Sequence, residues 1–284
     1  MKKIFLMLST VALIGCSAQT SDSRPTADSD TDNTETTLSS VSSVESEITV
    51  SSETTTETTE QNYTDTSVTT SNLTESTTSV TEFTESGDSY LTEMLTFNDL
   101  EYTDISDSNR LIVVDSEGFS CNVYLYQKNG GIWSQIKNTY GYIGKEGVTD
   151  NKTESDWGTP TGLYTLGFGF GTEEVDTNIE YRVINNNCYW IDDPSSPYYN
   201  QWVESEDITW NSAEHLIDYP VCYHYSIVIN YNMNPVISGK GSAIFLHCTS
   251  QSYTAGCVAV PEETMLFILQ WLDGNSTPYI LISK

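Results

Sequence analysis

Apolar residues in the C-terminal part of the chain occur in short runs, and some of these alternate with polar residues at every second position. Arg110–Asp115, Asn122–Gln127 and Ile132–Ile136 are the first three runs, and a turn at Asn129–Gly131 separates the last two. Alternation with period two puts one side of a run into a core and the other into solvent, as in half-buried strands. We therefore expect a β-hairpin or meander here.

Further strands are predicted in the same way along the rest of the chain. They are Leu163–Leu166, Tyr181–Ile184, Tyr225–Asn230, Ala243–His247 and Tyr279–Ser283. A Gly/Phe-rich bend is expected at Gly167–Gly171, and Leu91–Asp107 is interpreted as a short lead-in helix or strand.

A single convincing helix is predicted, at about 261–273. Pro261 stands near its first position, acidic residues fill the first turn and Gly274 follows its end. Its apolar stripe consists of Met265, Leu266, Ile268, Leu269 and Leu272. Many short strands with one late helix predict a mostly-β fold, either a sandwich or a barrel-like mixed sheet.

The first residues have the pattern of an export signal. Met1–Lys3 is positively charged, and Ile4–Ile14 is an almost unbroken apolar run that is too short to span a bilayer, which takes roughly 20 apolar residues. Cys16 directly after Gly15 resembles the lipobox of bacterial lipoproteins, in which the thiol receives a diacylglycerol. We expect residues 1–15 to be a lipoprotein signal peptide and Cys16 to be the lipid-anchored N-terminus, with ordinary secretion as the alternative.

Residues 16–97 are dominated by Ser, Thr, Asp and Glu and have no helical or strand periodicity. Such a composition buries too little apolar surface to offset ordering costs of about 1–2 kcal/mol per residue. We expect a disordered acidic tether between the membrane and one folded domain, residues 98–284. A tether of this kind would hold the exported domain out from the membrane, facing the cell wall.

The charge of the chain excludes one class of partner. Lys and Arg total 11 against 40 Asp and Glu, and the formal net charge is −29. Nucleic-acid binding needs clustered basic residues that neutralise phosphates, so a nucleic-acid partner is excluded. Of the six cysteines, five follow Cys16. This odd number indicates at least one free thiol in an exported domain.

The strongest candidate for chemistry is Gly239–Val260, with the sequence GKGSAIFLHCTSQSYTAGCVAV. A predicted strand carries His247 to its end, and Cys257 follows ten residues later, after a polar loop. An imidazole within hydrogen-bond reach turns a thiol into a thiolate–imidazolium pair, which is an activated nucleophile for acyl transfer. Gly256 leaves room beside the sulfur and lets backbone N–H groups point at a developing oxyanion.

Residue types alone leave structural interpretations open. Cys257 could form a disulfide with Cys248 or another cysteine, and His247 could be a buried group satisfied by its surroundings. A zinc site at Cys222, His224 and Cys248 is disfavoured, because a second paired motif is missing.

Three other polar residues are given structural interpretations. Asp192 and Asp193 lie between Trp and Pro and are expected to order a turn, not to act as catalytic carboxylates. His215 lies in a segment predicted to be a short helix or turn.

The segment around Cys257 resembles the active-site region of the L,D-transpeptidase family, the YkuD-type catalytic domain. In that family, a His at a strand end is followed at a distance by a Ser/Thr-x-Gly-Cys sequence, and here these elements are His247 and Thr254–Cys257. Upstream, Tyr142–Lys145 and the Thr-Pro-x-Gly turn at Thr159–Gly162 are similar to the family's early sheet and turn. The resemblance extends from about Arg110 to the C-terminus.

The resemblance implies a peptidoglycan L,D-transpeptidase in which Cys257 is the nucleophile, His247 is the general base and the Gly256 backbone lies near the oxyanion. The cysteine would attack the peptide bond after the L-centre of a diamino acid in a stem peptide. D-alanine would leave, and the thioester would pass to an amine of a neighbouring stem as a 3→3 cross-link. No metal or organic cofactor is implied. The Trp190–Asn200 loop and Ile229–Asn232 are similar to a Gram-positive branch of the family.

Beside the nucleophile the chain departs from the family's pattern. Many members carry a second His two residues before the cysteine and an Arg after it, where this chain has Ala255 and Val258–Ala259. The domain offers few basic residues to replace them, chiefly Lys145, Lys152, Arg182 and Lys240. Of these, Lys240, just before the predicted His247 strand, is expected to take over the holding of substrate carboxylates. Thr254 is a further candidate for substrate binding.

Two other functions fit the same residues. With water as the acceptor, the thioester gives an L,D-carboxypeptidase or endopeptidase. The missing second His and Arg also fit a non-catalytic module that binds the cell wall and keeps the fold.

Overall fold

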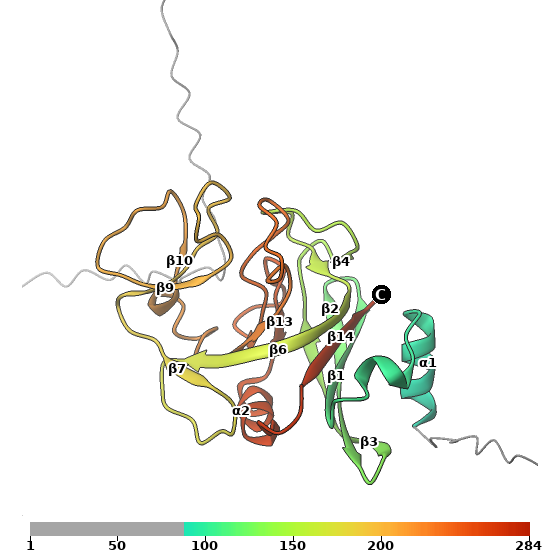
Figure 1. Ribbon diagram of the computed structural model, residues 1–284. Helices are drawn as coiled ribbons and strands as arrows, with labels where there is room; N and C mark the ends of the chain where they lie inside the picture. Colours follow the sequence, from blue (N-terminus) through green and yellow to red (C-terminus); the bar gives the residue numbers. More distant parts are fainter. Residues whose placement is uncertain (1–87) are drawn as a thin grey trace, which may run out of the picture. The chain divides into compact units, whose positions relative to one another are not determined.

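The computed structural model describes residues 88–284 (Figure 1). The predicted signal peptide, the lipidation at Cys16 and most of the predicted tether lie outside the described residues. Within the described part, no helix combines the length and the apolar character needed to cross a membrane.

A mixed sheet of nine strands forms the centre of the described region. Its order is β11-β12-β13-β3-β2-β1-β14-β6-β7, and a further pairing of β11 with β6 closes it into a barrel-like arrangement. The strands are β1 (Arg110–Glu117), β2 (Ser120–Asn129), β3 (Ile132–Tyr142), β6 (Gly162–Gly171), β7 (Tyr181–Val183), β11 (Tyr225–Ile229), β12 (Phe245–Cys248), β13 (Val258–Val260) and β14 (Tyr279–Ser283). The predicted mostly-β fold with a barrel-like mixed sheet is confirmed.

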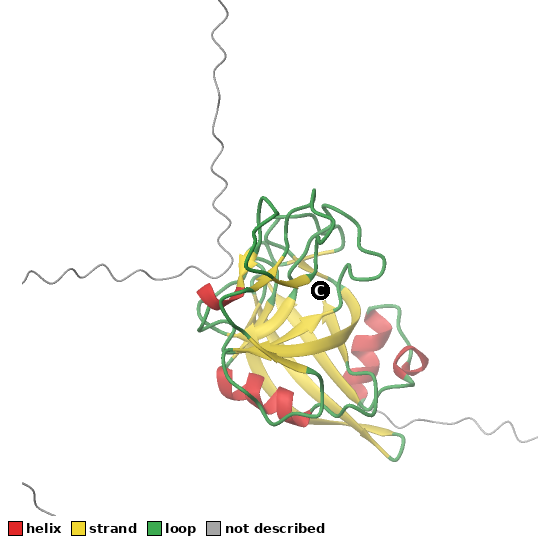
Figure 2. Cartoon of the chain, turned by 60° about the vertical axis from the view of Figure 1, so that its left-hand side comes forward, coloured by secondary structure: helices red, strands yellow, loops and turns green. Residues whose placement is uncertain are grey.

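Smaller elements flank this sheet. A three-stranded sheet has the order β10-β8-β9, and two short strands, β4 and β5, pair in parallel. Their bounds are β4 (Val148–Thr149), β5 (Thr159–Pro160), β8 (Cys188–Trp190), β9 (Trp202–Glu204) and β10 (Glu214–His215), with 3-10 turns η1 (Tyr102–Ile105) and η2 (Leu216–Asp218). In Figure 2, loops gather at one end of the barrel.

Two α-helices lie in the described residues, α1 (Ser89–Phe97) and α2 (Glu262–Trp271). The second confirms the helix predicted late in the chain, and it buries Met265, Ile268 and Leu269 against the barrel core. Figure 1 shows the two helices at different sides of the sheet.

Helix α1 lies in part where Leu91–Asp107 was interpreted as a short lead-in helix or strand, and it also occupies the end of the predicted tether. The Asp88 carboxylate caps it by accepting from the N–H groups of Tyr90 at 2.9 Å and Leu91 at 3.4 Å. Leu91, Met94 and Leu95 are buried and pack with residues of β1. The folded region therefore begins before residue 98.

Strand β6 continues through Gly167–Gly171, where a bend was expected. A Cβ atom at Gly169 would stand 2.7 Å from Tyr181 and 2.8 Å from Leu269, so these side chains pack directly on the strand's backbone. The glycines permit a close approach of neighbouring elements, a role that glycine often has inside strands.

Strand β12 separates two hydrophobic clusters by the alternation of its side chains. Leu246 and Cys248 point into the main barrel core. Phe245 belongs to a second cluster, which is rich in aromatic residues and also contains Tyr223 and Cys257. Because successive side chains of a strand face opposite sides, His247 lies on the same side as Phe245.

Candidate active site

His247 and Cys257 are carried by two neighbouring parallel strands. The register pairs Leu246 with Val258 and His247 with Ala259, so Cys257, immediately before β13, lies beside Phe245. At about 3.3 Å per residue, His247 lies roughly 6–7 Å further along the same face. The structure thus brings the two predicted residues to one side of one strand pair.

The hydrogen bond of His247 fixes which ring nitrogen can accept a proton. Nδ1 lies 2.9 Å from the carbonyl oxygen of Cys248, which can only accept, so Nδ1 carries the hydrogen and Nε2 of the neutral ring is the acceptor. The residue is 3% exposed. Burial lowers the pKa of His247 to about 4, and the bond to Cys248 opposes this only in part. The ring is therefore a neutral base at neutral pH.

Backbone groups hold the thiol of Cys257 on both sides. Sγ donates to the carbonyl oxygen of Ala243 at 3.2 Å and accepts from the N–H of Phe245 at 3.3 Å. Burial, followed by the charge of Glu214, raises the pKa of Cys257 to about 12, whereas the Phe245 N–H and Lys152 oppose the rise. The resting pair is a thiol and an imidazole. The thiolate–imidazolium pair expected from the residue types is not the resting state, because both groups are desolvated.

Cys257 does not form the disulfide with Cys248 that was considered as an alternative. Cys121, Cys188, Cys248 and Cys257 are all free, buried thiols. Cys248 faces the opposite side of β12, in the barrel core, so the alternation of the strand keeps it away from Cys257.

Two threonines fix the backbone of Cys257. Thr254 Oγ1 donates to the carbonyl oxygen of Cys257 at 2.7 Å, and Thr159 Oγ1 donates to the same oxygen at 3.3 Å. Thr254 is buried and also accepts from the N–H of Gly256 at 3.1 Å. Thr254, predicted to bind substrate, therefore forms hydrogen bonds with the backbone of Gly256 and Cys257. Thr159 had no predicted role, although its Thr-Pro-x-Gly motif had been recognised.

Gly256 adopts a backbone conformation that favours glycine, with φ of +145°. A Cβ atom there would stand 3.0 Å from the carbonyl oxygen of Gly158 and 3.3 Å from Nζ of Lys152. The N–H of Gly256 donates to Oγ1 of Thr254, so in this state it does not point at an oxyanion. The role of Gly256 is to permit close packing beside the thiol.

Lys152 is the cation that lies beside Gly256, the residue before Cys257. Its side chain is buried, its Nζ lies next to Gly256, and it pairs with Asp156 at 2.5 Å. Lys240, the predicted substrate-binding cation, is exposed, and its carbonyl oxygen accepts from the hydroxyl of Tyr231 at 2.6 Å. Sequence reasoning had no means of ranking the two lysines, because burial decides between them.

An aromatic ring connects the imidazole to an acidic side chain. The ring of Tyr223 stands edge-on to His247, with 5.7 Å between centroids, and its hydroxyl donates to Glu214. Burial raises the pKa of Glu214 to about 8, and the charges of Asp192 and Glu154 add to this rise.

The remaining polar candidates are tied into local structure. Asp193 accepts from Ser195 and Asn211, as expected of a residue that orders a turn. His215 pairs with Asp218 at 3.1 Å. His224 lies 3.2 Å from Glu262 on α2. Over residues 88–284, no group of three or more His, Cys, Asp or Glu is arranged to hold a metal ion.

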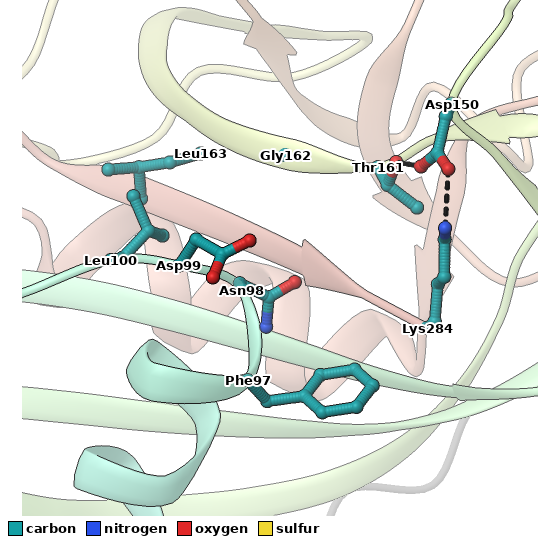
Figure 3. A pocket seen from close by; sticks show the side chains of 9 residues that line it. All are labelled: Phe97, Asn98, Asp99, Leu100, Asp150, Thr161, Gly162, Leu163 and Lys284. Carbon is teal, nitrogen blue, oxygen red and sulfur yellow. Dashed lines mark hydrogen bonds and ion pairs between the residues drawn. The ribbon is translucent and has the colours of Figure 1, made fainter.

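A pocket of about 480 Å³ lies at the C-terminal end of α1 (Figure 3). It is lined by Phe97, Asn98, Asp99, Leu100, Asp150, Thr161, Gly162, Leu163 and Lys284. Within it, Asp150 accepts hydrogen bonds from Thr161 and Lys284 (Figure 3). Neither His247 nor Cys257 lines this pocket, which is therefore distinct from the candidate active site.

One comparison with known proteins finds a family for this chain. The family model described as the L,D-transpeptidase catalytic domain (YkuD) matches residues 109–281. No curated protein matches the chain. The solved "Structure of Bdellovibrio bacteriovorus Bd1075" matches with 18% sequence identity and a TM-score of 0.34, covering 62% of this chain and 48% of that protein. The match thus spans about half the length of that protein.

Proposed function

Since this chain belongs to the L,D-transpeptidase (YkuD) catalytic-domain family, we propose that it cross-links peptidoglycan stem peptides through a thioester on Cys257. The observation that carries the proposal is that His247 and Cys257 lie on one face of the parallel pair β12 and β13. The proposal includes the 3→3 linkage between neighbouring stems.

The first half-reaction would begin with a proton transfer inside the resting pair. Nε2 of His247 takes the thiol proton of Cys257 as the sulfur attacks the carbonyl carbon after the L-centre of the donor's diamino acid. The tetrahedral intermediate collapses to a thioester, and the leaving D-alanine amine takes the proton from His247. Burial favours the neutral forms before and after this step, so charge exists only near the transition state.

The developing oxyanion needs a positive neighbour in a site with a low dielectric constant. The ammonium of Lys152 is the candidate that we propose, because its Nζ lies 3.3 Å from the place where a Cβ of Gly256 would stand. Preorganised groups of this kind lower an acyl-transfer barrier by roughly 3–4 kcal/mol. We therefore assign the stabilisation of the oxyanion to Lys152, and the holding of substrate carboxylates by Lys240 stays a prediction.

In the second half-reaction, an amine of a neighbouring stem would attack the thioester and restore the thiol. Attack by water instead gives the L,D-carboxypeptidase or endopeptidase reaction, and both use the same first step. The acceptor therefore determines which activity dominates.

The proposal is tested by incubating the full-length protein with purified disaccharide tetrapeptides and analysing the products by liquid chromatography and mass spectrometry. Dimers linked 3→3 are expected, and tripeptide monomers alone would mean hydrolysis. Cys257→Ala should abolish both products, whereas the matched control Cys248→Ala, which changes a buried thiol on the other face, should keep them. A folded protein that binds sacculi but forms neither product would be a wall-binding module.

We also propose that the protein is exported as a lipoprotein of a Gram-positive envelope and is anchored to the membrane through Cys16. The support comes from the apolar run Ile4–Ile14 and the Gly15–Cys16 junction. Metabolic labelling with an alkyne fatty acid should mark the protein in cells, and Cys16→Ala should abolish the label. Labelling that survives this change would refute the anchor.

A further inference from the structure

Trp157 has a strained backbone conformation in the segment that packs against Gly256. Its φ is +62°, and it is the only aromatic residue among the non-glycine residues of 88–284 that have a positive φ. This region of φ is unfavourable for a bulky side chain, and such strain is found mostly at active sites, ligand clamps and switch regions. The carbonyl oxygen of the next residue, Gly158, lies 3.0 Å from the place where a Cβ of Gly256 would stand. The strained residue is therefore a neighbour of the segment that carries Cys257.

The ring of Trp157 forms a cluster with Tyr253 and Lys145. The two rings meet edge to face, with 6.5 Å between their centroids. Nζ of Lys145 lies 5.9 Å from the centroid of Trp157 and 5.8 Å from that of Tyr253. A cation within about 6 Å of a ring centroid is attracted by the ring, so both rings position this ammonium. We call these three residues the Lys145 cluster.

Backbone hydrogen bonds hold the Lys145 cluster against the residues that precede Cys257. The N–H of Lys145 donates to the carbonyl oxygen of Thr254 at 3.0 Å. Oγ1 of Thr254 donates in turn to the carbonyl oxygen of Cys257 at 2.7 Å. The carbonyl oxygen of Trp157 accepts from the N–H of Glu146, the residue after Lys145, at 3.1 Å. The cluster thus has a fixed position relative to Cys257.

The ammonium of Lys145 is accessible and is not neutralised by a carboxylate. Lys145 is exposed, and Trp157 and Tyr253 are partly exposed. The chain has 40 Asp and Glu, yet none of the ion pairs within 88–284 includes Lys145. Lys152, by contrast, is buried and paired with Asp156. Lys145 is therefore a positioned surface cation that can receive an anionic group from solvent.

We propose that the Lys145 cluster binds the C-terminal D-alanine of the donor stem peptide. The ammonium of Lys145 donates to the carboxylate of this residue, and the rings of Trp157 and Tyr253 face its methyl group. The inference rests on the proposed function and names the residues that recognise its leaving group. The carboxylate belongs to the amino acid whose amide bond is cleaved, so it must lie near Cys257 when the sulfur attacks. A charge-assisted hydrogen bond of this kind is stronger than a neutral one.

The proposal is compatible with the prediction for Lys240, because a stem peptide carries more than one carboxylate. The described contacts of Lys240 are made by its backbone, whose N–H donates to Ile237 and whose carbonyl oxygen accepts from Tyr231. Within 88–284, neither a ring nor a carboxylate positions its ammonium. The terminal carboxylate is therefore assigned to Lys145.

The Lys145 cluster should act on the first half-reaction only. The carboxylate departs with D-alanine, so the contact no longer exists when the thioester is attacked. Substitution of Lys145 should therefore slow the release of D-alanine and leave the division of the thioester between amine and water unchanged.

The test compares two donors that differ only in the terminal carboxylate. Full-length protein is incubated with an acetylated tetrapeptide that ends in D-alanine, or with the same peptide ending in D-alaninamide, and kcat/KM is measured for release of the last residue. In Lys145→Met, the ratio of kcat/KM for the carboxylate donor to that for the carboxamide donor should fall about fivefold or more, because a charge-assisted contact is lost. The value for the carboxamide donor should change by less than about threefold. Any difference in intrinsic reactivity between the donors cancels when the ratio is compared with that of the unchanged protein.

Lys137→Met is the matched control, because Nζ of Lys137 also lies near an aromatic ring, 5.4 Å from the centroid of Phe267. Its ratio should equal that of the unchanged protein, and the ratio of Lys240→Met should do the same. An unchanged ratio in Lys145→Met would overturn the site, whether both donors react normally or both slow by the same factor. Loss of the ratio in Lys240→Met instead would also overturn it. Failure of the unchanged, folded protein to release the last residue from either donor would overturn the proposed function.

Discussion

The thiol of Cys257 donates its hydrogen bond to the carbonyl oxygen of Ala243, at 3.2 Å. A thiol has one proton, so in the resting state that proton is not shared with His247. In the proposed mechanism, Cys257 is stored in its neutral form and becomes ionised only when the proton moves to Nε2 of His247. This relationship distinguishes the protein from one with a preformed thiolate.

The stored thiol predicts slow alkylation without substrate. With its pKa raised to about 12 by burial, Cys257 should react with iodoacetamide at pH 7.5 at least about tenfold more slowly than a free cysteine, whose pKa is about 8.5. The rate should still rise above pH 9. Peptide mapping at a series of pH values measures this. A plateau near pH 6–7 would show a preformed thiolate–imidazolium pair.

The buried imidazole predicts a loss of stability in acid. His247 has a pKa of about 4 in the folded protein, against about 6.5 when unfolded, so the unfolded chain binds an extra proton as the pH falls from 6.5 to 4. Stability attributable to this group is unchanged above pH 6.5 and declines by up to about 3 kcal/mol below it. In urea unfolding, His247→Gln should reduce the loss between pH 7 and pH 4. An unaltered pH dependence would contradict the buried neutral ring.

Asn200 positions Ala243, whose carbonyl oxygen accepts the hydrogen bond of the Cys257 thiol. Its Oδ1 accepts from the N–H of Ala243 at 3.1 Å and from the indole of Trp190 at 3.0 Å. Asn200→Ala leaves both buried donors unpaired and should lower the free energy of unfolding by about 2–4 kcal/mol. The exposed Asn129→Ala should stay within about 0.5 kcal/mol. Equal changes in the free energy of unfolding for the two variants would show that Asn200 does not position Ala243.

The close contacts at Gly256 predict a steric effect on the site. Gly256→Ala places a methyl group 3.0 Å from the Gly158 carbonyl and beside the ammonium of Lys152, in addition to the strained φ. It should cost about 1–3 kcal/mol more than Gly239→Ala, where φ is also positive but no atom lies within 4 Å. Thermal denaturation of both variants measures the difference. Donor acylation should fall only in Gly256→Ala, and a normal rate there would argue against a tight site.

Most of the sheet could be predicted because alternation and turn residues are local. Runs such as Asn122–Gln127 and Tyr279–Ser283 lie in strands β2 and β14. Two errors have physical reasons. The Ser/Thr-rich composition around α1 conceals a cap at Asp88 and three buried side chains. The glycines of β6 indicate turns by composition but serve close packing against Leu269.

Only the part of the candidate site that lies within one segment of the sequence could be predicted. His247 and Cys257 lie near each other in the sequence and on adjacent strands, so their pairing follows from a local motif. Lys152, Tyr223 and Glu214 reach the site from three other segments through tertiary contacts. Their positions depend on long-range packing, and the ionisation of the thiol depends on burial. Neither can be derived from residue types alone.

The central claim is that the sulfur of Cys257, assisted by His247, is the atom that becomes acylated. Intact-mass analysis of the full-length protein after exposure to a carbapenem-type acylating agent, with peptide mapping of the adduct, measures this directly. One adduct on Cys257 is expected. It should be absent in Cys257→Ser, retained in Cys248→Ser and formed about 100-fold or more slowly in His247→Gln. A folded protein without an adduct, or with its adduct on another residue, would contradict the claim.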